Sequence, residues 1–109
     1  MIGADAGSLK DHQRFEEAKS LLRRTIPVAR RVLGEGADLT LRMRWIYAEA
    51  LYKGDGATLS DLRLAVNTLE EIERIARRVL GSAHPVTAAI ERNLQKARIM
   101  LRARESLHT

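Results

Sequence analysis

Few residues in this chain of 109 could do chemistry, and their spacing does not assemble a reactive site. His12, His84 and His108 are far apart in the sequence, and none has a partner at the spacing of a metal site or a catalytic triad. The chain has no cysteine, which excludes disulfides and thiolate zinc sites. Asp55 and Gly56 are similar to part of a calcium loop, but the acidic ladder and terminal glutamate are missing. We therefore predict that the protein is not an enzyme and needs no metal or cofactor, and that His84 is a turn residue whose ring bonds the backbone.

An internal repeat dominates the sequence. Residues 29–34 read Ala-Arg-Arg-Val-Leu-Gly, and the same six residues return at 76–81, an offset of 47. The same offset pairs other residues of like size: Phe15 with Leu62, Ala18 with Ala65, Leu22 with Leu69, Thr40 with Thr87, Met43 with Ile90 and Ala50 with Ala97. A fixed period of this length indicates a repeat protein, in which stacked units bury a shared core.

Apolar residues recur three and four positions apart in four segments, which predicts helices over about residues 11–33, 39–53, 59–80 and 86–104. No segment alternates β-branched and polar residues, so no strand is expected. Pro27 lies inside the first helix and predicts a kink near residues 23–24, because its ring removes one backbone hydrogen bond. We predict an all-α domain of antiparallel helical hairpins over residues 11–104, a disordered lead-in over 1–10 and a frayed tail over 105–109.

The expected inner faces follow from the same spacing. On the first helix they are Phe15, Ala18, Leu21, Leu22, Ile26, Ala29, Val32 and Leu33, and on the second Met43, Ile46, Tyr47, Ala50 and Leu51. On the third they are Leu62, Ala65, Val66, Leu69, Ile72, Ile75, Ala76 and Val79, and on the fourth Val86, Ile90, Leu94, Ala97 and Leu101. Trp45 lies off the stripe of the second helix.

Helix ends carry recognisable signals. Gly34 and Gly81 follow the last periodic residues and are expected to adopt a left-handed conformation there. Asp38 is the expected N-cap of the second helix. Thr58 followed by Asp61 is similar to a capping box, with Asp in place of the usual Glu.

Paired in this way, the helices resemble tetratricopeptide repeats of the kinesin light chain type. The stretch 80–87, Leu-Gly-Ser-Ala-His-Pro-Val-Thr, is similar to that family's Leu-Gly-x-x-His-Pro-x-Thr turn, and residues 33–40 keep its Leu-Gly and Thr. Ala48 stands where the family has a small residue for close helix approach, whereas Gln95 occupies that place in the fourth helix, and the period is longer than usual. The resemblance implies a short right-handed superhelix, with one full repeat flanked by two half-repeats.

The resemblance also implies a binding surface. First helices of these repeats line the concave side and hold peptides, which here gives Arg42, Trp45, Glu49, Tyr52, Lys53, Arg92, Asn93 and Lys96, together with Met100. Basic groups beside two aromatic rings suit an extended acidic peptide. The alternative is that Trp45 and Tyr52 pack between helices.

The net charge of +5 comes from 15 arginines and 4 lysines against 14 acidic residues. The arginines alternate with glutamates, which favours a solvated helical surface over a nucleic-acid site. We expect a non-enzymatic protein–protein interaction module that binds a peptide or protein, an acidic one being the candidate. Alternatives are a nucleic-acid-associated protein, which we expect less, and a structural fragment that self-associates through its repeat ends. We expect a cytoplasmic protein without a membrane partner.

Overall fold

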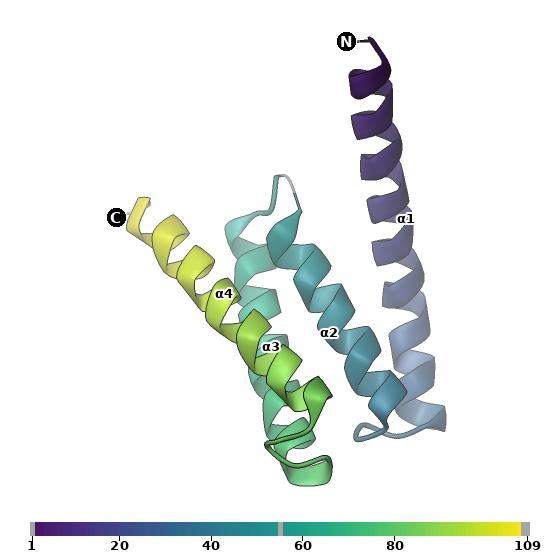
Figure 1. Ribbon diagram of the computed structural model, residues 1–109, viewed down its shortest axis with the longest axis vertical. Helices are drawn as coiled ribbons and strands as arrows, with labels where there is room; N and C mark the ends of the chain where they lie inside the picture. The colour runs from purple at the N-terminus through teal and green to yellow at the C-terminus, as the bar shows by residue number, and fades with distance from the viewer. Residues whose placement is uncertain (1, 55, 108–109) are drawn as a thin grey trace.

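The computed structural model describes the backbone of residues 2–54 and 56–107, and the side chains from residue 12 onward within these ranges. Four helices make up this part of the chain: α1 (Ile2–Val32), α2 (Asp38–Lys53), α3 (Leu59–Val79) and α4 (Pro85–Leu107) (Figure 1). No strand occurs among the described residues. The all-α class and the number of helices are therefore as predicted.

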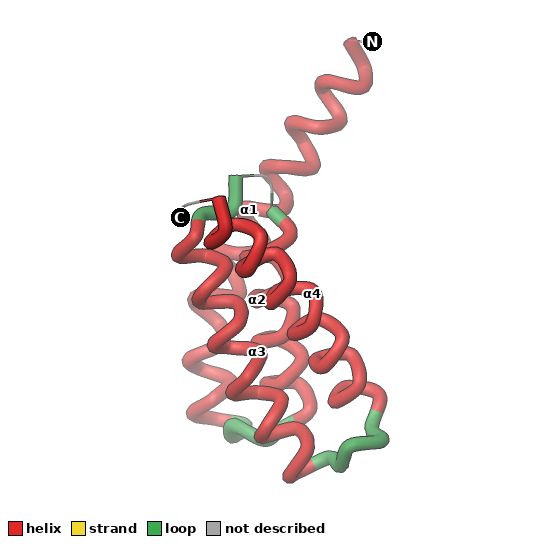
Figure 2. Tube along the Cα trace, turned by 90° about the vertical axis from the view of Figure 1, so that its left-hand side faces the viewer, coloured by secondary structure: helices red, strands yellow, loops and turns green. Residues whose placement is uncertain are grey.

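Helix α2 is the centre of the arrangement. It packs against α1, α3 and α4, and α3 packs in addition along α4. In Figure 1, α1 and α2 run side by side, and α4 crosses in front of α3. Figure 2 shows that the first turns of α1 project away from the other three helices. Because α2 has neighbours on several sides, more of its circumference is covered than a single stripe would provide.

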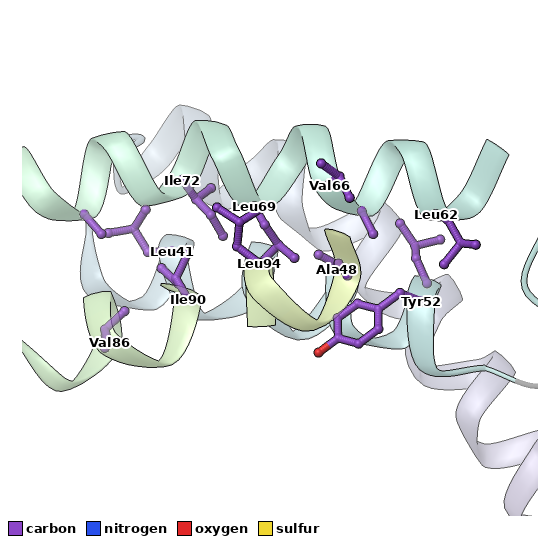
Figure 3. Packing of buried hydrophobic residues seen from close by; sticks show 14 residues of the cluster. Leu41, Ala48, Tyr52, Leu62, Val66, Leu69, Ile72, Val86, Ile90 and Leu94 are labelled. Atoms are coloured by element: carbon purple, nitrogen blue, oxygen red, sulfur yellow. The ribbon is translucent and has the colours of Figure 1, made fainter. Parts of the chain in front are cut away.

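The core lies between α2, α3 and α4 (Figure 3). Its fully or nearly buried residues are Leu41, Ala48, Leu51 and Tyr52 of α2, Leu62, Ala65, Val66, Leu69, Ile72 and Ala76 of α3, and Val86, Ile90, Leu94 and Ala97 of α4. The predicted inner faces of α3 and α4 are confirmed except at the ends, since Val79 is exposed and Ile75 and Leu101 are half-buried.

The predicted inner face of α2 is wrong in part. Ile46 is exposed, and Met43, Tyr47 and Ala50 are only half-buried. Leu51 enters the core as predicted, but its companions there are Leu41, Ala48 and Tyr52, which lie on a neighbouring face of the helix. The physical reason is that α2 turns one face to the α3–α4 pair and another to α1, and the apolar stripe chosen from the sequence includes the α1 side.

Helix α1 is also less covered than predicted. Of its expected inner residues only Ala29 is buried, and Phe15, Leu22 and Ile26 are half-buried. The others, Ala18, Leu21, Val32 and Leu33, are exposed, because α1 has α2 as its main neighbour.

The two Arg-Arg-Val-Leu-Gly segments occupy the same setting. Each closes a helix, and the glycine that follows has a positive φ, +96° at Gly34 and +92° at Gly81. Three backbone hydrogen bonds recur at the offset of 47: the N–H groups of residues 33, 37 and 41 bond the carbonyls of 29, 34 and 37, and those of 80, 84 and 88 bond the carbonyls of 76, 81 and 84. The repeated sequence therefore folds into a repeated helix–turn–helix junction.

Capping at the helix starts agrees with the sequence in two places out of three. Thr58 and Asp61 form the full capping box, with reciprocal side-chain to backbone bonds of 3.0 Å. The His84 ring accepts a hydrogen bond at Nδ1 from the backbone N–H of Val86 (3.1 Å), as expected of a turn residue. Asp38 is not the N-cap of α2, because Ala37 holds that position and the Asp38 side chain pairs with Arg42 one turn later.

The helix ends extend beyond the predicted bounds. Helix α1 begins at Ile2, where we expected a lead-in through residue 10, and it continues through Pro27. Helix α4 continues to Leu107 because its last turns are anchored: Arg104 Nη1 donates to the carbonyl of Ala57 (2.8 Å), and Glu105 pairs with Arg63 at 3.7 Å. Met1, Asp55, His108 and Thr109 lie outside the described residues.

Candidate functional site

The residues expected to bind a peptide lie on two facing stripes, one on α2 and one on α4. On α2, the positions 42, 45, 49 and 52 are three or four apart and share one face. On α4, positions 93, 96 and 100 do the same. The stripes meet where the Tyr52 hydroxyl donates to the side-chain oxygen of Asn93. The name α2–α4 face is used here for the outer part of these two stripes: exposed Arg42, Lys53, Arg92, Lys96 and Met100, with half-buried Trp45 and Glu49.

Tyr52 and Asn93 are not part of the exposed surface. They are 1% and 6% exposed, and Asn93 uses its amide group to donate to the Ala89 carbonyl (2.9 Å). Burial raises the pKa of Tyr52 to about 12, since the ionised phenolate would lose its hydration. Both residues were expected to contact a peptide, but they are buried and instead join α2 to α4 through their hydrogen bond.

The basic groups of the α2–α4 face differ in whether they are already neutralised. On α2, Arg42 pairs with Asp38, and Lys53 pairs with Glu49 (3.5 Å). On α4, Arg92 and Lys96 are exposed and make no ion pair or hydrogen bond with the described part of the chain. The positive charge available to a partner is therefore concentrated on α4.

Trp45, on the α2 stripe of the same face, has an unusual feature. Its ring is half-buried and packs against the core. Its Nε1–H is enclosed and has no hydrogen-bond acceptor within the described residues. An indole N–H without an acceptor leaves a donor unsatisfied at a cost of about 1–3 kcal/mol. Trp45 therefore packs against the core, in line with the alternative prediction for this residue, and its indole N–H has no acceptor in the described chain.

Two searches of the described part of the chain concern metal ions and membranes. Its residues include no group of three or more His, Cys, Asp or Glu side chains placed to hold a metal ion. Within the same residues, none of the helices combines the length and the apolar character that crossing a membrane requires.

Comparison with known proteins adds no family. No protein-family model matches the chain, and neither a curated protein nor a solved structure matches it significantly. Function must therefore be argued from the residues themselves.

One buried cation, Arg44, was not predicted from the sequence. Its side chain is 7% exposed, and Nη1 lies 3.3 Å from Glu71 and 3.5 Å from Glu35. Glu35 is held in addition by two bonds from Arg30, of 2.8 and 2.7 Å, which lower the pKa of its carboxyl group. The available signal was spacing, because position 44 falls three residues after Leu41 in the buried register of α2.

Proposed function

We propose that this protein is a non-enzymatic interaction module, a short tetratricopeptide-like stack that binds an acidic peptide segment of another protein on its α2–α4 face. Two features of the fold support the repeat architecture: the helix–turn–helix junction recurs at the offset of 47, and α2 packs against α4 as well as α3. In a tetratricopeptide stack, the first helix of one repeat would pack against the first helix of the next, and α2 and α4 correspond to these two helices.

The observation that carries the binding proposal is the pair of unneutralised cations on the same α2–α4 face as Trp45. Arg92 and Lys96 are exposed without an acidic partner in the described chain, whereas Arg42 and Lys53 on the opposite stripe are paired. An acidic side chain on a bound peptide would pair with these cations.

Fluorescence of the tryptophan tests this proposal directly, because Trp45 is the one tryptophan of the chain. Titration with a library of varied acidic peptides is expected to shift the Trp45 emission saturably. Arg92→Glu should abolish that shift, whereas Arg78→Glu should leave it intact. Arg78 is a matched control because it is also an exposed arginine without a described partner, on α3. The proposal fails if no peptide changes the emission or if both variants respond alike.

Salt dependence separates this proposal from nucleic-acid association. Binding driven by phosphates falls steeply with salt, with a slope of roughly one order per phosphate neutralised. Single-stranded and duplex oligonucleotides in the same assay should therefore bind weakly, since many arginines of this protein already pair with glutamates.

Self-association is a second candidate, favoured by the outer side of α1. Leu21, Val28 and Val32 lie there at helical spacing and are 58%, 45% and 69% exposed. A contiguous apolar stripe of this kind is typical of an interface. Light scattering after size-exclusion chromatography should detect a dimer or larger species at micromolar concentration, and Val28→Lys should dissociate it. A monomer throughout this range would exclude the interface.

A further inference from the structure

A second polar site lies between α1, α2 and α3, on the far side of α2 from the α2–α4 face. It is a pocket of about 170 Å³ whose charged lining consists of Arg23, Arg30 and Arg44. Tyr47 and Thr68 add hydroxyl groups, and the apolar part of the wall includes Ile26 and Pro27. Three arginines line this one pocket, and the neighbouring carboxylates of Glu35 and Glu71 pair with only two of them, Arg30 and Arg44.

The buried member of the set is only partly satisfied. The Arg44 side chain is more than nine-tenths buried, and both of its ion pairs, to Glu35 and Glu71, are made through Nη1. The Nε and Nη2 groups have no acceptor in the part of the chain that the structure describes. A guanidinium group has five N–H donors, so Arg44 keeps one edge available while it lines the pocket.

Two further donors stand at the pocket. Arg23 donates from Nε to the Tyr47 hydroxyl (3.2 Å), and its guanidinium group lies over the Tyr47 ring, 6.0 Å from the centroid. This arrangement leaves both terminal nitrogens of Arg23 without an acceptor among the described residues. Because the Tyr47 oxygen accepts that bond, its own O–H remains free to donate. Arg23, Arg44 and Tyr47 therefore bring hydrogen-bond donors from α1 and α2 to the lining of the pocket.

The charge at the pocket limits what can fill it. Glu35 and Glu71 pair with two of the three arginines, Arg30 and Arg44, whereas Arg23 makes no ion pair in the described chain and feels Glu16 and Asp61 only at longer range. One cation of the pocket is therefore left unpaired. A carboxylate supplies one negative charge, whereas a phosphate carries between one and a half and two at neutral pH, about one more than the site balances. The planar fork of an arginine also suits a carboxylate geometrically.

From these observations we propose that the α1–α2–α3 pocket binds a carboxylate group, which Arg44 and Arg23 hold by charge-assisted hydrogen bonds and to which the hydroxyls of Tyr47 and Thr68 donate. The size of the pocket admits the carboxylate with a short apolar stem, which would lie against Ile26 and Pro27. The group can come from a free small carboxylate or from an acidic side chain of a bound peptide, and both sources present the same chemistry.

The test follows the Nε–Hε signals of the arginines by NMR while sodium acetate replaces sodium chloride at constant ionic strength. Saturable shifts are expected at Arg44 and Arg23. A parallel titration uses a capped peptide that contains one aspartate. Tenfold tighter binding of the peptide would identify a peptide as the source, whereas equal binding would identify a small free carboxylate.

Matched variants distinguish a built site from general attraction of anions. Arg23→Gln should weaken acetate binding about tenfold, because one charge-assisted hydrogen bond is lost. Thr68→Val should weaken it severalfold while keeping the side-chain shape. Arg24→Gln is the control, since Arg24 is an exposed arginine next in sequence that does not line the pocket. None of these three variants alters the buried Arg44, so all three are expected to fold.

Three results would overturn the assignment. Shifts that grow linearly without saturation would show that acetate does not occupy a site. An equal loss of binding in Arg24→Gln would show that only net charge matters. Tighter binding of inorganic phosphate than of acetate would contradict the choice of a single negative charge. The pocket and the α2–α4 face use different residues. A negative acetate titration would therefore not affect the Trp45 fluorescence test, and a negative fluorescence test would not affect the acetate titration.

Discussion

Replacing the glycine at either repeat junction by alanine should destabilise the fold by about the same amount. Gly34 and Gly81 have φ of +96° and +92°, and an added Cβ would meet no atom within 4 Å at either position. The effect of alanine is therefore conformational and not steric. The left-handed backbone costs an L-residue about 1–2 kcal/mol. Alanine recovers about 0.4–1 kcal/mol of this by restricting the unfolded chain. The net loss for Gly34→Ala or Gly81→Ala is therefore about 1 kcal/mol.

Thermal unfolding measures this loss, which corresponds to about 4–8 °C in a domain of this size class. Gly34→Asn and Gly81→Asn are the matched controls, because asparagine enters the left-handed region more readily and should lower the Tm less than alanine does. The reasoning is refuted if both alanine variants melt at or above the Tm of the parent protein. A loss at one junction only would contradict their structural equivalence.

Three other perturbations test separate parts of the fold. Gly36→Ala would place its Cβ 3.0 Å from a methyl group of Val79, so it should destabilise by about 1 kcal/mol or more, and adding Val79→Ala should restore the Tm. The pKa of Tyr52 is raised to about 12, above its unfolded value near 10, so the free energy of unfolding should fall as pH rises from about 10 to 12. Chemical denaturation across this range should show that Tyr52→Phe lacks this part of the decline. His84→Ala removes the acceptor for the Val86 N–H and should lower the unfolding free energy by about 1 kcal/mol in a urea titration, whereas an unchanged midpoint would show that the bond contributes nothing.

The helices and their junctions could be predicted because their signals are local. Helical spacing defined three of the four segments to within a few residues, and Gly34, Gly81 and the Thr58 box act on their immediate neighbours. One error arose where a distant element decides. The apolar stripe of α2 was mixed because the helix has two covered sides, one against α1 and one against α3 and α4. The error at Asp38 is local, since the cap lies one residue earlier at Ala37 and the Asp38 carboxylate pairs with Arg42 in the same helix.

The candidate site was predictable only as a set of positions on a face. Helical periodicity places Arg42, Trp45 and Glu49 together, but it does not tell which polar side chain lies against a neighbouring helix. Burial of Tyr52 depends on the approach of α4, more than forty positions later, where Asn93 supplies its acceptor. Arg44 was missed for the same reason, since its carboxylate partner on α3 is distant in the sequence.

The equivalence of the two junctions has a consequence for how this molecule can change in length. The chain enters the turn after α1 and the turn after α3 through the same three backbone hydrogen bonds and the same glycine conformation. A second copy of residues 38–84 spliced in before Pro85 would therefore begin and finish on connections that the protein already uses. Growth by whole 47-residue units would preserve every splice point and leave the first and last helices as the terminating pieces.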